Sequence, residues 1–249
     1  MLKHLTAIGI LGVTWLALYA YFPMHDGRPP SDSALAPLAD KYGPQRHSEH
    51  GEEWIVRDHF NDKRDGFFVD VGAHHYQIAS NTYFLEKELG WSGIAIEPQT
   101  QFQADYATHR PRTKFRPFFV SDVSHARAKL YLDPNNPLIA SGEKGFTSAL
   151  GSGTLQETEV PTITLTDLLD AEGVTRIDFL SMDIELWEPK ALAGFDVDRF
   201  KPSLVCVESH PEVRQQILDY FAAHNYVVVG KYLQMDQHNL YFQPRGAGV

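Results

Sequence analysis

The chain has 249 residues, a mass of 28.1 kDa and a formal net charge of -10 at pH 7. This length suits one well-packed domain and leaves a remainder too short for a second one. The negative charge argues against nucleic acid as a partner, because a phosphate backbone requires a basic face, and it is compatible with a small-molecule, sugar or cationic substrate. Cys206 is the only cysteine, which excludes an intramolecular disulfide, and its place in the apolar run LVCV predicts a buried thiol.

An apolar segment lies close to the amino terminus. Residues 5–23, LTAIGILGVTWLALYAYFP, carry no charge and approach the length that spans a bilayer, with aromatic residues toward the far end. We predict a single-pass transmembrane anchor over residues 1–23. A cleaved signal peptide is the alternative, although no A-x-A site closes the run. Lys3 before the run and Arg28 after it favour an inside amino terminus, with the rest of the chain in the periplasm or a lumen, but two charges leave the side open.

Two further regions follow this segment. Residues 24–50 are rich in Pro, Ser, Asp and His without periodicity, which predicts a linker, and residues 51–249 are predicted to form the catalytic domain. In that domain, apolar strands alternate with helical stretches. The pattern predicts strands over 66–73, 93–98, 114–122, 177–185 and 204–210, helices over 80–90, 102–109, 163–173 and 211–224, and a closing antiparallel hairpin of 226–233 with 239–244. Such alternation predicts an α/β, Rossmann-like fold with a mainly parallel sheet.

Residues 125–160 break the alternation. The segment ARAKLYLD, residues 126–133, predicts an extra strand. The segment NPLIASGEKGFTSALGSGT, residues 136–154, predicts a Gly/Ser-rich loop. A long loop beside the strand ends is typical of a lid or a substrate clamp, and disorder without function is the alternative.

Polar side chains gather at the carboxyl ends of the predicted strands, where ligands bind in parallel sheets. They are Asp70, His74 and His75 on the first strand, Glu97 on the second, Asp122 on the third, Asp183 and Glu185 on the fourth, and Glu208 and His210 on the fifth. Glu97 is well placed to accept the ribose hydroxyls of a nucleoside, and Asp122 is a candidate partner for adenine. One such acid alone is typical of a helix cap, but polar ends on five strands predict a binding site.

Several longer segments carry a family resemblance: VDVGA, SNTYFLEKELGWSGIAIEP, VPTITLTDLLDAEGVTRIDFLSMDIE, KALAGFD and NLYF. With them, residues 54–244 resemble the FkbM-type family of S-adenosylmethionine-dependent methyltransferases. The resemblance implies a class I methyltransferase fold that methylates hydroxyl groups of sugars or other small metabolites. It implies cofactor contacts at Asp70, Gly72, Glu97 and Asp122. It also implies that Asp183 faces the methyl group and the acceptor.

Two turns depart from the family pattern. Where the family has VDVGA-N-x-G, this chain has His74, His75 and Tyr76; where the family has D-x-E-G-x-E, Leu186 replaces the glycine, beside Trp187. Glycine permits positive φ and a close approach of the backbone to the cofactor, which larger side chains do not readily allow. Both departures lie at the predicted pocket, so they bear on whether the methyl donor binds.

The same residues suggest a metal site. If the first, fourth and fifth strands are neighbours, a set of histidines and acids converges at their ends: His74, His75, Asp183, Glu185, Glu208 and His210. Imidazole and carboxylate ligands suit Zn, Mn, Fe or another divalent ion. Adjacent histidines cannot both point inward from one strand, so at most one of them contributes. The alternative is that they pack or hydrogen-bond to acids, with His74 or His210 as a general base.

Three functions follow from these observations. The first is a membrane-anchored, S-adenosylmethionine-dependent methyltransferase acting on a hydroxyl of a small-molecule or glycan-like acceptor. Asp183 would orient the acceptor, and His74 or His210 would take its proton. The second is a metal-dependent enzyme on the same scaffold that has lost methyl-donor binding. The third is a non-catalytic binding module tethered to the membrane.

Overall fold

The computed structural model describes residues 32–151 and 153–247 of the chain. The anchor predicted over residues 1–23 lies outside these residues. Among the residues described, no helix has the length and apolar character needed to cross a membrane. From Ser33 onward the described residues form one compact unit, which holds the sheets described below.

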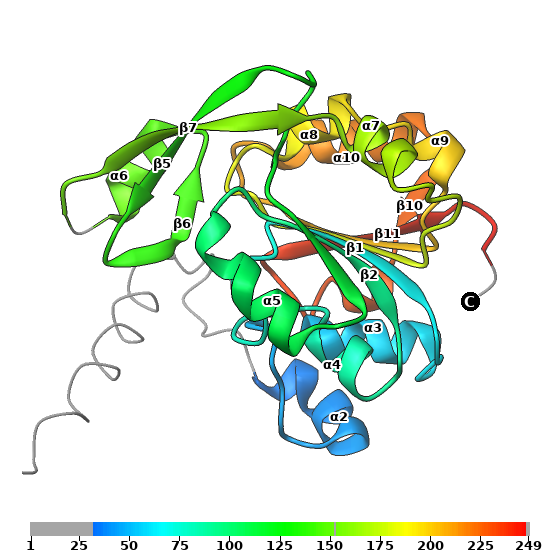
Figure 1. Cartoon of the computed structure of the whole chain (residues 1–249). Helices are drawn as coiled ribbons and strands as arrows, with labels where there is room; N and C mark the ends of the chain where they lie inside the picture. The colour runs from blue at the N-terminus through cyan, green and yellow to red at the C-terminus, as the bar shows by residue number, and fades with distance from the viewer. Residues whose placement is uncertain (1–31, 152, 248–249) are drawn as a thin grey trace, which may run out of the picture. The chain divides into compact units, whose positions relative to one another are not determined.

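A seven-stranded sheet runs through this unit in the spatial order β10-β11-β9-β8-β1-β2-β3 (Figure 1). Its strands are β1 (Phe67–Val71), β2 (Ser92–Ile96), β3 (Thr113–Arg116), β8 (Phe179–Met182), β9 (Leu204–Glu208), β10 (Tyr226–Val228) and β11 (Asn239–Pro244). Strands β9, β8, β1, β2 and β3 are parallel, and β11 pairs antiparallel with both β9 and β10. The predicted α/β fold with a mainly parallel sheet is confirmed. The closing antiparallel pair is also present, but its first strand is shorter than the predicted 226–233, since β10 ends at Val228 and Gly230–Tyr232 form a 3-10 turn.

Helices cover both faces of this sheet (Figure 1). The described helices are α2 (Asp32–Tyr42), α3 (Glu52–Phe60), α4 (Tyr83–Lys87), α5 (Gln103–His109), α6 (Lys144–Leu150), α7 (Leu165–Ala171), α8 (Glu188–Ala193), α9 (Val197–Phe200) and α10 (Arg214–Ala223), with 3-10 turns η1 (Thr100–Phe102) and η2 (Gly230–Tyr232). Helices α7 to α10 pack on one face, and α2, α3 and α4 pack on the other. The fold is therefore a three-layer sandwich around one parallel sheet.

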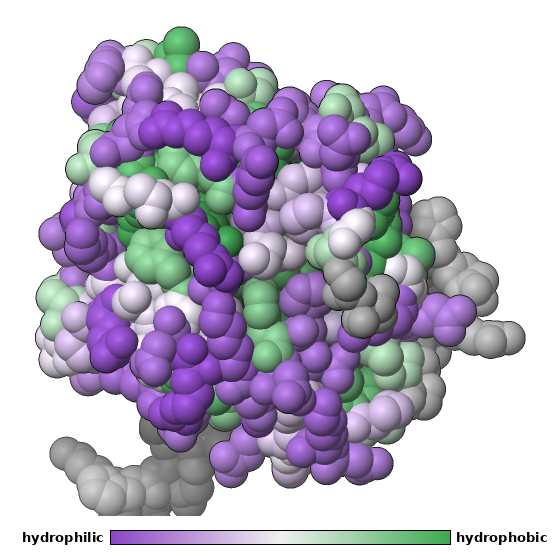
Figure 2. All heavy atoms as spheres, turned by 90° about the vertical axis from the view of Figure 1, so that its right-hand side faces the viewer, coloured by the Kyte–Doolittle hydropathy of each residue, from purple (hydrophilic) through white to green (hydrophobic). Residues whose placement is uncertain are grey.

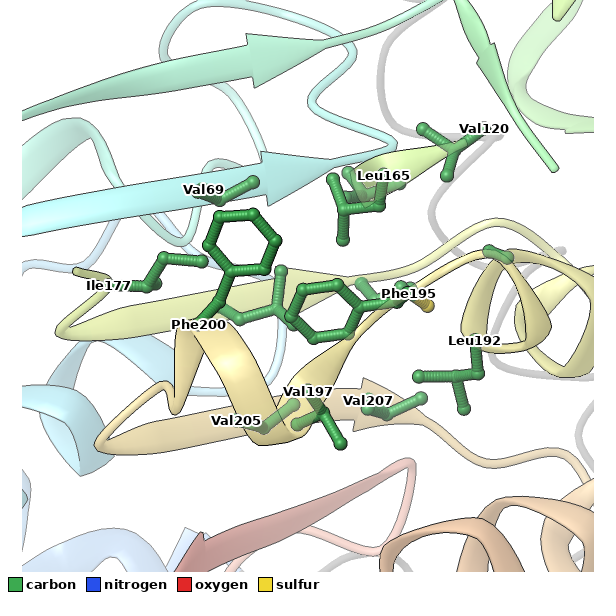
Figure 3. Close-up of a cluster of buried hydrophobic side chains, with 14 of the residues drawn as sticks. Val69, Val120, Leu165, Ile177, Leu192, Phe195, Val197, Phe200, Val205 and Val207 are labelled. Atoms are coloured by element: carbon green, nitrogen blue, oxygen red, sulfur yellow. The ribbon is translucent and has the colours of Figure 1, made fainter. Parts of the chain in front are cut away.

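The alternation of side chains along β1 divides the core between the two faces. Val69 and Val71 point to the face covered by α7 to α10, where Figure 3 shows Val69 next to the ring of Phe200. Phe68 points to the opposite face and packs in the second cluster. Because successive residues of a strand face opposite sides, a fully apolar strand is stable only when both faces are covered. The apolar run of β1 is therefore explained by its central place.

A second, four-stranded sheet has the order β4-β7-β5-β6. Its strands are β4 (Phe119–Val120), β5 (Arg127–Asp133), β6 (Asn136–Ser141) and β7 (Gln156–Ile163). The extra strand predicted over 126–133 is confirmed as β5, but the single strand predicted over 114–122 is wrong. It is divided at Pro117 into β3, which belongs to the large sheet, and β4, which belongs to the small one. Proline cannot donate a ladder hydrogen bond, which explains the break.

The loop predicted over residues 136–154 is also partly wrong. Strand β6 pairs antiparallel with β5, and helix α6 follows it. Ile139 is only 3% exposed and belongs to the core. This packing with β5 stabilises a strand that the Gly/Ser-rich composition does not indicate, since β propensity depends on the partner strand.

Part of the predicted linker, residues 24–50, is helical. Helix α2 lies within it, and its Leu35 and Leu38 are buried against the cluster that includes α3. Helix α2 therefore packs, through Leu35 and Leu38, in the same cluster as α3.

The molecular face in Figure 2 is largely hydrophilic, with apolar side chains in small separate areas. The large apolar side chains that are most exposed among the described residues are Ile78, Val123, Leu138 and Leu233, which come from four different parts of the chain. Isolated side chains of this kind are normal on a monomer surface. Of these, Leu138 alone lines the pocket described next.

Candidate active site

A pocket lies at the carboxyl ends of the parallel strands, where β1 separates β2 from β8 and the strand order reverses. Ligands bind at such switch points in open α/β sheets. One wall comes from the ends of β1, β2 and β8: Gly72, His74, Glu97, Asp183 and Glu185. The facing wall is apolar and comes from the small sheet: Phe119, Leu130, Leu138 and Ala140. The small sheet therefore closes the pocket on the side away from the strand ends.

Gly72 brings the turn after β1 close to the turn after β8. Its φ is +84°, and a Cβ at this position would lie 1.8 Å from the carbonyl oxygen of Asp183. Its N–H donates to the carbonyl oxygen of Ile96 at 2.9 Å. Only glycine permits both this backbone conformation and this approach, which explains the glycine of the VDVGA motif.

Glu97 follows β2 and lies beside Gly72 in the pocket. Its side chain is buried, and its carboxylate accepts the N–H of Gln99 at 2.8 Å and the N–H of His74 at 3.3 Å. Burial raises the pKa of Glu97 to about 7 despite these two hydrogen bonds. A carboxylate oxygen accepts more than one hydrogen bond, so the group retains capacity for ligand hydroxyls.

His74 occupies the turn position at which the family has asparagine, and its φ is +41°. The ring lies 4.3 Å from the ring of Phe102, and both ring nitrogens are buried without a hydrogen-bond partner among the described residues. Burial, with a smaller contribution from His75, lowers the pKa of His74 to about 4. The imidazole is therefore neutral at pH 7 and offers the pocket one unpaired donor and one unpaired acceptor. Tyr76, at the family's glycine position, has no positive φ.

Five of the predicted site residues lie outside the pocket lining: Asp70, His75 and Asp122, described here, and Glu208 and His210, described below. Asp70 is buried beneath it and accepts the hydroxyl of Thr82 at 2.7 Å, which ties β1 to the start of α4. Asp122 is exposed and accepts the hydroxyl of Ser121. The ring of His75 stacks on Tyr76 at 4.5 Å, with its Nδ1 occupied by two backbone N–H groups.

A cluster of charged side chains lies next to Asp183, at the ends of β8 and β9. The Nε2 of His210 lies 2.9 Å from a carboxylate oxygen of Glu208 and 3.4 Å from one of Glu185. Burial lowers the pKa of His210, but hydrogen bonds to these two carboxylates outweigh burial and raise it to about 10. The structure thus brings together three of the six predicted metal ligands, with Asp183 nearby, and separates His74 and His75 from them.

Asp183 stands between the cluster and the pocket. Loss of water around the carboxylate, together with the like charges of Glu208 and Glu185, raises its pKa well above the ordinary value. Asp183 is nevertheless an exposed residue, so solvent screens part of its repulsion by the neighbouring carboxylates and limits the rise of its pKa.

Glu188 belongs to the cluster and was missed by the prediction from sequence. It is fully buried at the start of α8, where one oxygen accepts the N–H of Ile184 at 2.9 Å and the other has no partner among the described residues. The spacing of acids at positions 183, 185 and 188 is the signal that could have identified it.

The turn that carries these acids has an unusual backbone. Glu185 and Leu186 both have positive φ, at 57° and 73°. Leu186 stands where the family has glycine. Because a side chain makes the left-handed conformation unfavourable, the turn adopts it at a cost of about 1 kcal/mol or more per residue. The small sheet supports it: the hydroxyl of Ser141 donates to the carbonyl oxygen of Glu185 at 2.6 Å, and Trp187 packs closely on Gly142.

Comparisons with known proteins identify the family. The model of the methyltransferase FkbM domain matches residues 70–228, which is more than half of the chain. No protein with a curated description matches. Because the FkbM match extends from Asp70 to Val228, from β1 through β10, it includes the pocket and the charged cluster.

The chain is also similar to several solved structures, all of low sequence identity, among them a [4+2]-cyclase and several methyltransferases. A precorrin-6y C5,15-methyltransferase from Geobacter metallireducens is 10% identical over 71% of each chain, with a TM-score of 0.42. A 1,6-didemethyltoxoflavin-N1-methyltransferase from Burkholderia thailandensis, solved with S-adenosylhomocysteine, is 12% identical over 98% of this chain and 93% of that one, with a TM-score of 0.39. On the evidence of the domain match, the chain belongs to the methyltransferase FkbM family.

Proposed function

We propose that this protein transfers a methyl group from S-adenosylmethionine to a hydroxyl of a small-molecule or glycan-like acceptor. The observation that carries the proposal is the single pocket that joins Gly72 and Glu97 to Asp183. The first two are the features of a nucleoside site, and the last lies on the side from which an acceptor would enter.

The residues of the pocket fit the cofactor. Glu97 stands at the end of β2, where an acidic side chain accepts ribose hydroxyls, and Gly72 allows the chain to pass close to the ligand. The two unpaired ring nitrogens of His74 offer hydrogen bonds that no described residue provides. When bound, the cofactor supplies an electrophilic methyl group whose carbon–sulfur bond breaks as the acceptor oxygen forms a bond to carbon.

The residues of the pocket orient the acceptor, exclude water and accept the acceptor's proton. Asp183 orients the acceptor hydroxyl, and the apolar wall of Leu130, Leu138 and Ala140 keeps water away. His74 takes the hydroxyl proton. Its pKa of about 4 makes it a weak base, but a hydroxyl becomes strongly acidic as its oxygen gains a methyl group, so a weak base suffices. His210, the other base predicted from the sequence, is already held by two carboxylates.

The anchor predicted over residues 1–23 remains part of this proposal. It would tether the enzyme to a membrane, so the full chain should be recovered in the membrane fraction and released by detergent but not by high salt. Recovery of the intact chain in the soluble fraction would remove the anchor from the proposal without affecting the transfer chemistry.

Calorimetric titration of S-adenosylmethionine into the full chain tests the proposal. We expect micromolar binding that Glu97→Ala weakens at least tenfold, because the variant loses the ribose hydrogen bonds. Glu159→Ala is the matched control, since this exposed glutamate lies on β7 in an ion pair with Arg127, away from the pocket. Absence of binding by the wild-type chain, or equal affinity of Glu97→Ala and Glu159→Ala, would contradict the proposal.

A further inference from the structure

We propose that Glu185, Glu208 and His210 bind a divalent metal ion at the edge of the pocket. Each residue offers one ligand atom, and the three atoms all lie within 4.8 Å of one another. Metal bonds to carboxylate oxygen and imidazole nitrogen are about 2.0–2.2 Å long, so ligand atoms around one ion lie about 3 Å apart. The distances of 2.9 Å and 3.4 Å from His210 Nε2 are already close to this spacing.

The charge of the cluster favours a cation. Asp183 and Glu188 interact electrostatically with the acids of this set, so the cluster holds four carboxyl groups and one imidazole. Among the described residues, the ion pairs of Glu185 and Glu208 are made with His210, and no Lys or Arg pairs with these acids. Buried like charges are costly unless a counter-ion accompanies them. A single divalent ion would act as that counter-ion.

Unused ligand capacity is the second sign of an ion. The Oε2 atom of Glu208 is buried with no hydrogen-bond partner among the described residues, and so is the Oε2 atom of the fully buried Glu188. Buried carboxylate oxygens are almost always hydrogen-bonded, so each such atom requires an explanation. A metal ion bound at Glu208 provides one for that oxygen, and its positive charge would also favour the carboxylate of Glu188, which interacts electrostatically with Glu208 and His210.

The backbone holds the ligands in place before any ion arrives. Glu208 ends β9 and His210 follows at i+2, which turns both side chains to the same side. Glu185 sits on the left-handed turn after β8, fixed by the hydrogen bond from Ser141. Phe146 of α6 packs edge-on against His210, with ring centroids 5.2 Å apart. Strained backbone that the surroundings maintain is typical of functional sites, so the arrangement favours a binding role over mere packing.

The position of the ion suggests its role, which rests on the proposed function. Glu185 and Asp183 line the pocket, so an ion at Glu185 would lie on the acceptor side. Three protein ligands leave open coordination positions, as in metal sites that bind substrate. An acceptor with two neighbouring oxygen atoms, such as a sugar diol, would fill them, and the ion would orient the hydroxyl that receives the methyl group.

Titration with Mn²⁺ tests the site directly. The full chain, treated with EDTA and dialysed, is titrated with MnCl₂ while free Mn²⁺ is followed by its electron paramagnetic resonance signal. We expect one Mn²⁺ to bind per chain. The isosteric variant Glu185→Gln and the variant His210→Gln should each weaken binding at least tenfold, because each removes one of three ligands.

His224→Gln is the matched control, because His224 forms an acid–histidine pair with Asp198 at the surface, 2.6 Å long, and its loss should leave Mn²⁺ affinity unchanged. His75→Gln should also leave it unchanged. Absence of saturable Mn²⁺ binding by the wild-type chain would overturn the site whatever the variants do. Equal affinity of the wild type, Glu185→Gln and His210→Gln, with circular dichroism showing all of them folded, would overturn it as well.

S-adenosylmethionine titrated into the same metal-free samples separates the two proposals. Cofactor binding without Mn²⁺ binding would leave the methyltransferase proposal standing and remove the metal site. Mn²⁺ binding that depends on Glu185 and His210, without cofactor binding, would support the metal site and contradict the proposed function.

Discussion

Gly72 and the carbonyl oxygen of Asp183 lie so close that a Cβ at position 72 would meet that oxygen at 1.8 Å. The turn after β1 and the turn after β8 are thus joined by backbone contact, with no side chain between them. Both residues line the pocket, so this contact forms part of its wall.

Gly72→Ala should therefore lower the free energy of unfolding by about 3 kcal/mol or more, because the backbone must shift as well as adopt a strained φ. Gly173→Ala is the control: Gly173 also has a positive φ, +68°, but a Cβ there meets nothing within 4 Å, so we expect a loss of about 1 kcal/mol. Urea denaturation measures both. Equal losses would mean that the approach to Asp183 does not constrain the fold.

Arg110 and Glu86 form a buried ion pair beneath the first turn, 2.6 Å long, and Arg110 also donates to the carbonyl oxygen of Tyr76 at 2.9 Å. Arg110→Met should destabilise the protein by about 3–5 kcal/mol, since it leaves the Glu86 carboxylate buried and unpaired. Arg127→Met breaks the exposed pair with Glu159 and should cost less than about 1 kcal/mol. Thermal or urea unfolding would show the difference, and similar values for the two variants would argue against the structural role of Arg110.

Glu53 is fully buried in α3, and this burial raises its pKa from 4.5 to about 7 although the N–H of His47 donates to it. The folded state therefore keeps its proton to higher pH than the unfolded state does. The contribution of Glu53 to stability is fully present below pH 4.5, and it is lost as the pH rises through 7.

Glu53→Gln, which cannot lose a proton, should gain stability relative to the wild type by up to about 3 kcal/mol between pH 4.5 and pH 8. Urea unfolding at a series of pH values measures this difference. A difference that stays constant over the range would contradict the raised pKa.

The raised pKa of Glu97, about 7, predicts a pH-dependent ligand affinity. The ionised carboxylate is the better acceptor for ribose hydroxyls, so affinity should rise about tenfold from pH 6 to pH 8. Methylthioadenosine is the appropriate probe because, without an amino acid group, it does not titrate in this range. Glu97→Gln should bind weakly and independently of pH. A flat profile for the wild type would show that Glu97 does not contact the ligand.

The sequence predicted the central sheet because most of its strands are largely apolar and are followed by polar residues, as β1 (Phe67–Val71) is followed by His74. The prediction of secondary structure failed where pairing with a partner strand determines the conformation. Strand β6 depends on β5, and Pro117 moves the following residues into the small sheet. Asp122 consequently lies outside the pocket, because β3 ends at Arg116.

The predicted metal ligands were also only partly correct, because the backbone conformation of one turn, at His74, decides which of them converge. The i, i+2 pair Glu208 and His210 was predicted to converge with Glu185, and it does. His74 and His75 do not join them, because the left-handed backbone at His74 sends adjacent rings to Phe102 and to Tyr76. No residue pattern in the sequence specifies that conformation, since histidine takes the place of the usual asparagine.

A crystal structure of the full chain with S-adenosylhomocysteine would test the central claim most directly. We predict that both ribose hydroxyls donate to the Glu97 carboxylate, that the chain beyond the ribose passes Gly72, and that the sulfur faces Asp183. A ligand bound elsewhere, or a ribose that makes no hydrogen bond with Glu97, would contradict the account.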